Sequence, residues 1–141
     1  MKTSEKLDPR LNPETSLLAS IVRSSNDAII GKTLEGIVTS WNPAAERIFG
    51  YAASEPIGQS FLAIFPPDSI SEESDILARI SRGESVEHFE TVRVRKDGSS
   101  IDISATISPV KNADGRVVGV SKIARDITSL KVHERETSRL S

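Results

Sequence analysis

The chain of 141 residues contains no cysteine, which excludes disulfides, thiolate metal sites and cysteine-centred catalysis. It also lacks any apolar run near the roughly 18 residues that span a bilayer, and residues 1–25 are too polar for a signal peptide. We therefore expect a cytoplasmic segment that makes no direct contact with a membrane.

A strong excess of one charge is absent as well. The formal net charge is -2 and no long basic run occurs, so the Lys and Arg cluster on which nucleic-acid affinity depends is lacking. The phosphate-binding, zinc-protease and nucleophile-elbow motifs are also absent. Glu72, Glu73 and Asp75 resemble a carboxylate cluster, but acidic residues are typical of the first turn of a helix, where we expect them to be solvated. We expect no catalytic residues in this segment.

The length and an apolar content of 37% suit one domain with one core. Residues 1–13 are polar and predict a loose leader. Asn12-Pro13 is a helix-start signal, and it is followed by apolar residues at helical spacing that predict an amphipathic helix over 14–25. The apolar stripe of this helix consists of Leu17, Leu18, Ile21 and Val22.

The rest of the chain alternates between helix and strand signals. Asn42-Pro43 and Gly50 bracket a short helix, prolines break up residues 51–68, and Ser69 with Glu72 forms a potential capping box for a helix over 71–82. Strict alternation from Ile101 to Ile107 is the clearest strand signal. The predicted strands cover residues 28–32, 36–41, 86–95, 101–107 and 117–127, and a further helix begins near residue 129.

Six short motifs in this order resemble the PAS (Per-Arnt-Sim) family of sensory domains. They are Asn42-Pro43-Ala44-Ala45-Glu46-Arg47-Ile48-Phe49-Gly50-Tyr51, Ile57-Gly58, Lys96-Asp97-Gly98, Ile107-Ser108-Pro109-Val110, Asp114-Gly115 and Arg125-Asp126-Ile127-Thr128. The resemblance implies an α+β fold with a five-stranded antiparallel sheet in the order 2-1-5-4-3, short helices on one face and flanking helices at both ends. The PAS domain would cover residues 14–128, and residues 129–141 would begin an output helix.

The resemblance further implies a ligand pocket between the sheet and the helices. Its candidate residues are Phe49, Phe61, Ile64, Phe65, Ile76, Ile80, Phe89, Thr91, Ile103, Ala105, Ile107, Lys122 and Ala124. The alternative is that these side chains fill an ordinary core. An inward Lys122 would require an anionic partner and could hold a carboxylate ligand, whereas a Lys122 that reaches the rim or turns outward is the interpretation that the sequence favours.

No cofactor is predicted. PAS relatives of the light-oxygen-voltage and photoactive yellow protein types use a cysteine, which this chain lacks, and haem-binding relatives commonly use a histidine on the helix that corresponds to residues 71–82, where none occurs. His88 and His133 are expected at the surface or at an interface, and no metal site is predicted. Non-covalent flavin has no positive signal in the sequence.

The resemblance implies a signalling role. Asp126 and Thr128 would form the relay between the core and the output helix, where their side chains can accept hydrogen bonds from free amides. The stripe of Leu17, Leu18, Ile21 and Val22 is a candidate homodimer contact. We expect a sensor of a small ligand or redox cue that acts through dimer geometry on a C-terminal effector, most commonly a histidine kinase. The alternative is a ligand-free dimerisation or protein-interaction module.

Overall fold

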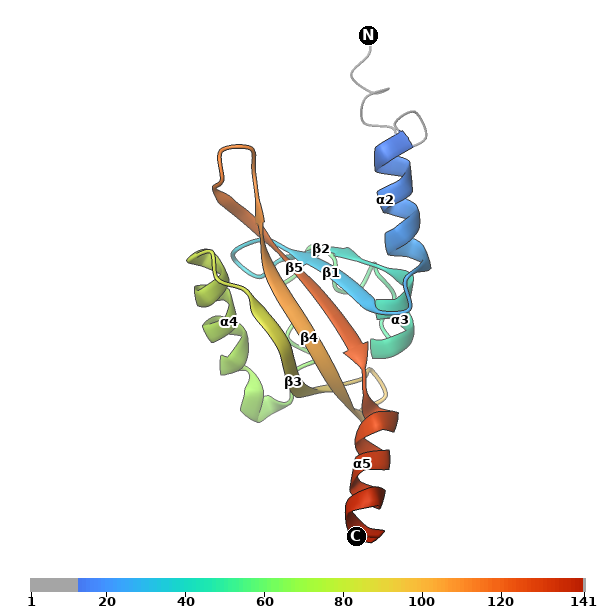
Figure 1. Ribbon diagram of the computed structural model, residues 1–141. Coiled ribbons are helices and arrows are strands. Elements are labelled where there is room, and N and C mark those ends of the chain that lie inside the picture. Colours follow the sequence, from blue (N-terminus) through green and yellow to red (C-terminus); the bar gives the residue numbers. More distant parts are fainter. Residues whose placement is uncertain (1–12, 141) are drawn as a thin grey trace.

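The computed structural model describes residues 13–140, which form a curved sheet with a helix projecting from each end (Figure 1). The predicted polar leader lies outside the described residues, apart from Pro13. The elements in chain order are α2 (Pro13–Ser24), β1 (Ala28–Lys32), β2 (Val38–Trp41), α3 (Pro43–Phe49), the 3-10 turn η2 (Pro67–Ser69), α4 (Ser71–Ser81), β3 (Val86–Val94), β4 (Ser100–Lys111), β5 (Val117–Asp126) and α5 (Thr128–Leu140).

The five strands pair in the order β2-β1-β5-β4-β3, and every pairing is antiparallel. This confirms the predicted fold class and strand order. The first and last strands of the domain therefore lie side by side at the centre, with Ala28 of β1 opposite Ala124 of β5. Helices α3 and α4 cover one face of the sheet, whereas α2 and α5 leave it at opposite ends (Figure 1).

The core lies between the sheet and these covering helices. Along β4 the residues Ile101, Ile103, Ala105 and Ile107 are buried, whereas the residues between them are partly exposed. This alternation is the predicted period of two, because successive side chains of a strand point to opposite faces. The inward row of β5 is formed in the same way by Val120, Lys122 and Ala124.

Asn42 joins α2, β1 and α3 through a single buried side chain. Its carbonyl oxygen accepts hydrogen bonds from the backbone amides of Ala45 (3.0 Å) and Ile29 (2.9 Å), and its amide donates to the carbonyls of Val22 (2.9 Å) and Asp27 (3.1 Å). The predicted N-cap of α3 is therefore confirmed, and the same residue also holds the end of α2 against the core.

The predicted capping box at the start of α4 is wrong. Ile70 occupies the cap position and makes no side-chain hydrogen bond there. Glu72, which the box would have used, points instead towards the sheet, where it pairs with an arginine. Tertiary ion pairing has thus taken precedence over a local helix-start motif.

Candidate functional site

Three basic side chains from three strands converge beneath α4 around the ring of Phe65. Lys32 of β1 and Lys122 of β5 place Nζ 5.8 and 5.7 Å from the ring centroid, and the guanidinium carbon of Arg93 of β3 lies 4.0 Å from it. All three residues are buried, with exposed fractions of 7% for Lys32, 3% for Lys122 and 0% for Arg93. We call Lys32, Arg93 and Lys122 the cation cluster.

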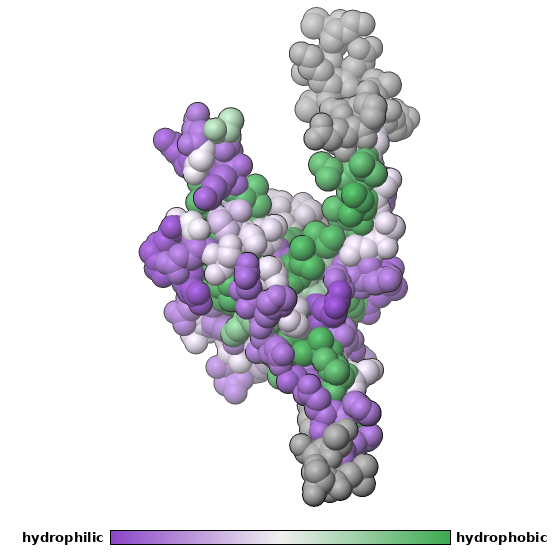
Figure 2. Space-filling view, viewed as in Figure 1, coloured by the Kyte–Doolittle hydropathy of each residue, from purple (hydrophilic) through white to green (hydrophobic). Residues whose placement is uncertain are grey.

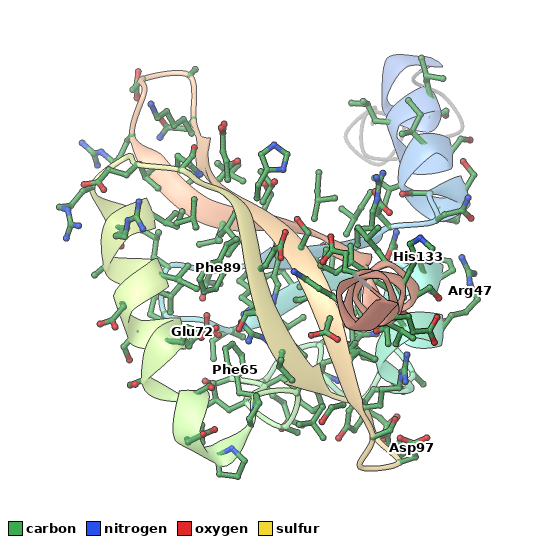
Figure 3. The ribbon with its side chains drawn as sticks, turned by 60° about the horizontal axis from the view of Figure 1, so that its bottom comes forward. Arg47, Phe65, Glu72, Phe89, Asp97 and His133 are labelled. Carbon is green, nitrogen blue, oxygen red and sulfur yellow. The ribbon has the colours of Figure 1, made fainter. Side chains whose placement is uncertain are left out.

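Two carboxylates on the first turn of α4 face the cation cluster. Glu73 Oε2 lies 2.7 Å from Lys32 Nζ, and Glu72 Oε1 lies 2.8 Å from Arg93 Nη2. Figure 3 shows Glu72 and Phe65 between α4 and the strands. The sequence-based expectation that these glutamates are solvated is therefore wrong, because the inward-facing strand residues opposite them are cations rather than hydrocarbons.

Lys122 differs from its two neighbours because no hydrogen bond or ion pair joins it to any residue that the structure describes. Burial lowers the pKa of Lys122 well below its ordinary value, and the charges of Lys32 and Arg93 lower it further. Arg93 has an unused donor as well, since its buried Nε has no partner among the described side chains. Two cationic side chains thus carry unused hydrogen-bond donors in one small region.

A small cavity lies at the cation cluster, under α4. It offers the centre of a water molecule about 10 Å³, which is room for about one water. Four of the nine residues in its wall are charged and five are apolar. The residues that line it are Lys32, Phe65, Glu73, Ile76, Leu77, Arg93, Ile107, Val120 and Lys122.

Some of the residues named from the sequence line this cavity, one lies beside it, and the others lie in the core away from it. Phe65, Ile76, Ile107 and Lys122 line the cavity. Thr91 lies beside it, with its hydroxyl 3.4 Å from both carboxylate oxygens of Glu72. The remaining candidates pack into or against the hydrophobic core: Phe49, Phe61, Ile64, Ile80, Phe89, Ile103, Ala105 and Ala124. Lys122 is buried, contrary to the rim or outward position that the sequence favoured.

Lys32 and Arg93 were missed by the sequence analysis. The signal was the strand period itself, because Arg93 continues the inward row of Phe89 and Thr91, and Lys32 continues that of Ala28 and Ile30. Basic residues at the ends of such rows are more often read as solvated strand ends. The alternation therefore could have found both residues, although it could not show that they approach Lys122.

Comparison with known proteins decides the family. The sequence profile of the PAS fold matches residues 16–127, which is most of the chain. The chain belongs to the PAS family. A solved PAS domain of a protein from Colwellia psychrerythraea is 26% identical, covers 81% of this chain and 97% of its own, and superposes with a TM-score of 0.73.

Full-length relatives of this PAS domain include sensor kinases. The signal transduction histidine-protein kinase AtoS of Escherichia coli strain K12 is 30% identical over 84% of this chain and 19% of its own length. The methanogenesis regulatory histidine kinase FilI of Methanothrix harundinacea is 28% identical over 90% of this chain and 14% of its own length. The chain spans less than a fifth of these two curated relatives.

The cavity as described is much smaller than the pockets that hold ligands of cofactor size. Pockets for ligands of cofactor size have volumes of about 300–1,000 Å³, whereas the centre of a water molecule has about 10 Å³ here. His88 is exposed on β3 and His133 is exposed on α5. Among the side chains that the structure describes, no group of three or more His, Cys, Asp or Glu residues could hold a metal ion, and none of the described helices is long and apolar enough to cross a bilayer.

The junction between β5 and α5 is tied to the neighbouring strands by polar contacts. Asp126 Oδ1 accepts a hydrogen bond from the Thr128 amide (2.9 Å), and Asp126 Oδ2 lies 3.3 Å from Nη2 of Arg95. Thr128 Oγ1 accepts from the amide of Asp102 on β4 (3.1 Å) rather than from an amide of its own helix. Asp126 therefore contacts the first amide of α5, while Thr128 ties the start of the helix to β4.

Apolar patches lie on α2, on the part of the sheet next to it and at the start of α5, as Figure 2 shows in green. Of the predicted dimer contacts, Leu17, Leu18 and Ile21 are 60%, 58% and 51% exposed, while Val22 is half-buried. Other large exposed apolar side chains are Val118 and Ile123 on β5 and Leu130 and Val132 on α5.

Proposed function

We propose that this PAS domain is a homodimeric, non-catalytic sensor that binds a small ligand beside the cation cluster and passes the change along β5 and α5 to a C-terminal histidine kinase. The main observation behind this proposal is that strand β5 reaches from the cavity to the start of α5. Lys122 and Ala124 of β5 face the interior, and Asp126 ends the same strand at the first turn of α5. A shift of β5 would therefore move the helix directly, because only Ile127 lies between them.

Hydrogen–deuterium exchange tests this route, because exchange reports local opening of individual helices. Lys122→Met alters the cavity end of β5, and we expect the exchange rates of amides 128–132 to change. Lys111→Met, at the exposed end of β4, is the matched control and should leave these rates unchanged. Identical α5 exchange in both variants and the parent would contradict the relay.

The apolar surface of α2 supports the homodimer. Three leucine and isoleucine side chains are exposed on one helix, and such a patch is typical of an interface. We expect sedimentation velocity to give a dimer, Leu17→Glu to give a monomer, and Ser81→Glu, on α4, to leave the dimer intact. A monomeric parent chain would refute this part of the proposal.

The histidine kinase assignment is supported by the names of AtoS and FilI. Sequencing the gene on both sides of this segment tests the assignment directly. A histidine phosphorylation helix followed by an ATP-binding domain is expected downstream, and an unrelated effector there would overturn the assignment.

The small cavity favours a second candidate function, a dimerisation module that binds no ligand. With about 10 Å³ available to the centre of a water molecule and Phe65 in the middle of the cation cluster, the interior is nearly filled. Native mass spectrometry, combined with an absorbance scan, separates the two functions. Bound mass that disappears on denaturation supports the sensor, whereas an empty, colourless dimer that also binds none of the anions tested below supports the interaction module.

A further inference from the structure

The cation cluster contains one more cation than the carboxylates beside it can match. Glu73 pairs with Lys32 and Glu72 pairs with Arg93, and both are at ion-pair distance. Lys122 has no such partner among the described residues, although only 3% of it is exposed. A buried charge is strongly unfavourable unless it is paired and hydrogen-bonded. When Lys122 is protonated, the site is therefore one negative charge short of balance.

The unused donors indicate what would supply that charge. No hydrogen bond or ion pair joins Lys122 Nζ to the residues that the structure describes, and the buried Nε of Arg93 has no partner among them either. Both residues line the same cavity. A carboxylate has two acceptor oxygens and a single negative charge, so it meets both needs. A phosphate dianion would exceed the missing charge.

The remainder of the cavity wall is hydrocarbon. The apolar residues that line it are Ile76 and Leu77 of α4, Ile107 and Val120 of the sheet, and Phe65. Hydrocarbon of this kind favours an aliphatic tail over a second polar group. Since the present volume holds about one water, a tail of a few carbon atoms requires α4 to move away from the sheet.

The ion pairs that hold α4 could be weakened by a ligand. Glu72 and Glu73 connect the first turn of this helix to two members of the cation cluster. A carboxylate that enters the cluster competes with these glutamates for the same cations. Its binding would therefore weaken the attachment of α4 at the moment when the cavity has to widen.

We propose that the cation cluster binds the carboxylate of a short aliphatic monocarboxylate, with its tail between α4 and the sheet beside Ile107 and Val120. This inference rests on the proposed function, because it names the ligand class of the same cavity. The internal glutamates occupy the cluster when no ligand is present, and the ligand carboxylate neutralises Lys122.

A titration of the chain with butyrate tests the proposal. Binding is monitored by the NMR chemical shifts of the isoleucine and valine methyl groups. We expect saturable binding with a Kd on the order of 1 mM, which is reasonable for so small a ligand. Butyramide has the same shape without the charge, and we expect at least roughly tenfold weaker binding for it. The assignment would be overturned if butyramide bound as tightly as butyrate. It would also be overturned if chloride, at the same concentration as butyrate, displaced it as an equal competitor.

Two variants move the affinity in opposite directions. Lys122→Met removes the unpaired cation, and binding of butyrate should weaken at least about tenfold, whereas the exposed Lys111→Met should bind as the parent does. Glu73→Gln removes the carboxylate that competes for Lys32, and binding should tighten by roughly tenfold. Unchanged affinity in both site variants would overturn the proposal, even if butyrate binds elsewhere.

The hydrogen–deuterium exchange experiment on α5 allows this inference and the proposed function to be refuted independently. A chain that binds no monocarboxylate, but whose α5 exchange responds to Lys122→Met, would refute the carboxylate and leave the relay in place. A chain that binds butyrate without any response in α5 would refute the relay and leave the carboxylate site in place.

Discussion

Replacement of Lys122 by methionine should stabilise the domain, although it removes a charged residue from the centre of the molecule. Lys122 is 3% exposed and its ammonium is unpaired among the described residues, while the two adjacent carboxylates are engaged at 2.7 and 2.8 Å by other cations. Methionine keeps a similar unbranched stem and removes the desolvated charge. Replacing buried ionic groups with apolar ones raises stability by about 1–4 kcal/mol in favourable cases.

We expect a gain of about 1–3 kcal/mol in the free energy of unfolding at pH 7, because a single charge is removed and the cavity is small. For a domain of this size, each kcal/mol corresponds to about 3–5 °C in Tm. Urea denaturation followed by circular dichroism measures the difference between Lys122→Met and the parent. Lys111→Met serves as the control and should remain within about 0.5 kcal/mol of the parent.

The gain should shrink as the pH rises from 7 towards 10. The pKa of Lys122 is lowered in the folded chain, so between that lowered pKa and the ordinary value the unfolded chain holds a proton that the folded chain lacks. The stability of the parent therefore rises with pH across this window, by at most about 1.4 kcal/mol per pH unit. Lys32, Arg93, Glu72 and Glu73 face Lys122 and are kept in both proteins. A variant that is less stable than the parent, or a gain that is constant with pH, would refute the reasoning.

Three further substitutions test the packing and the output junction. Asn42→Ala removes four hydrogen bonds between α2, β1 and α3 and should destabilise the chain by about 2–4 kcal/mol in urea denaturation, whereas the exposed Asn26→Ala should change it little. Gly50 ends α3 at a φ of 83°, so Gly50→Ala should lower stability by about 1–2 kcal/mol, and no change would contradict the left-handed cap. Thr128→Val removes the acceptor for the Asp102 amide and should lower stability by about 1 kcal/mol and speed exchange at that amide; unchanged exchange would refute this role.

Local signals determined the helices and strands of this chain. Asn42 and Gly50 act within a few residues of the helix that they begin and end, and the alternation from Ile101 to Ile107 depends only on the pleat of one strand. These features involve short-range hydrogen bonds and side-chain direction, so their sequence patterns could be read without knowledge of distant segments. The order of the strands, by contrast, came from the family resemblance.

The candidate site could be predicted only in part. Phe65, Ile76 and Ile107 were chosen because they are apolar and face inward in the family fold, but the same description applied to residues such as Phe49, which fill the core. Packing distinguishes the two groups. A core residue and a cavity residue have the same local pattern, because the difference is the presence or absence of atoms from another element.

The sequence by itself determined the secondary structure, the exclusion of cysteine chemistry and the presence of an amphipathic first helix. Only the tertiary structure decided that Lys32, Arg93 and Lys122, which come from three different strands, surround one phenylalanine ring, and that two glutamates pair with Lys32 and Arg93. The physical reason is that the energy of a charge depends on its neighbours and on its distance from water. Each of these residues is an ordinary surface type in the sequence, and it becomes part of a site when the strands pair and α4 covers them.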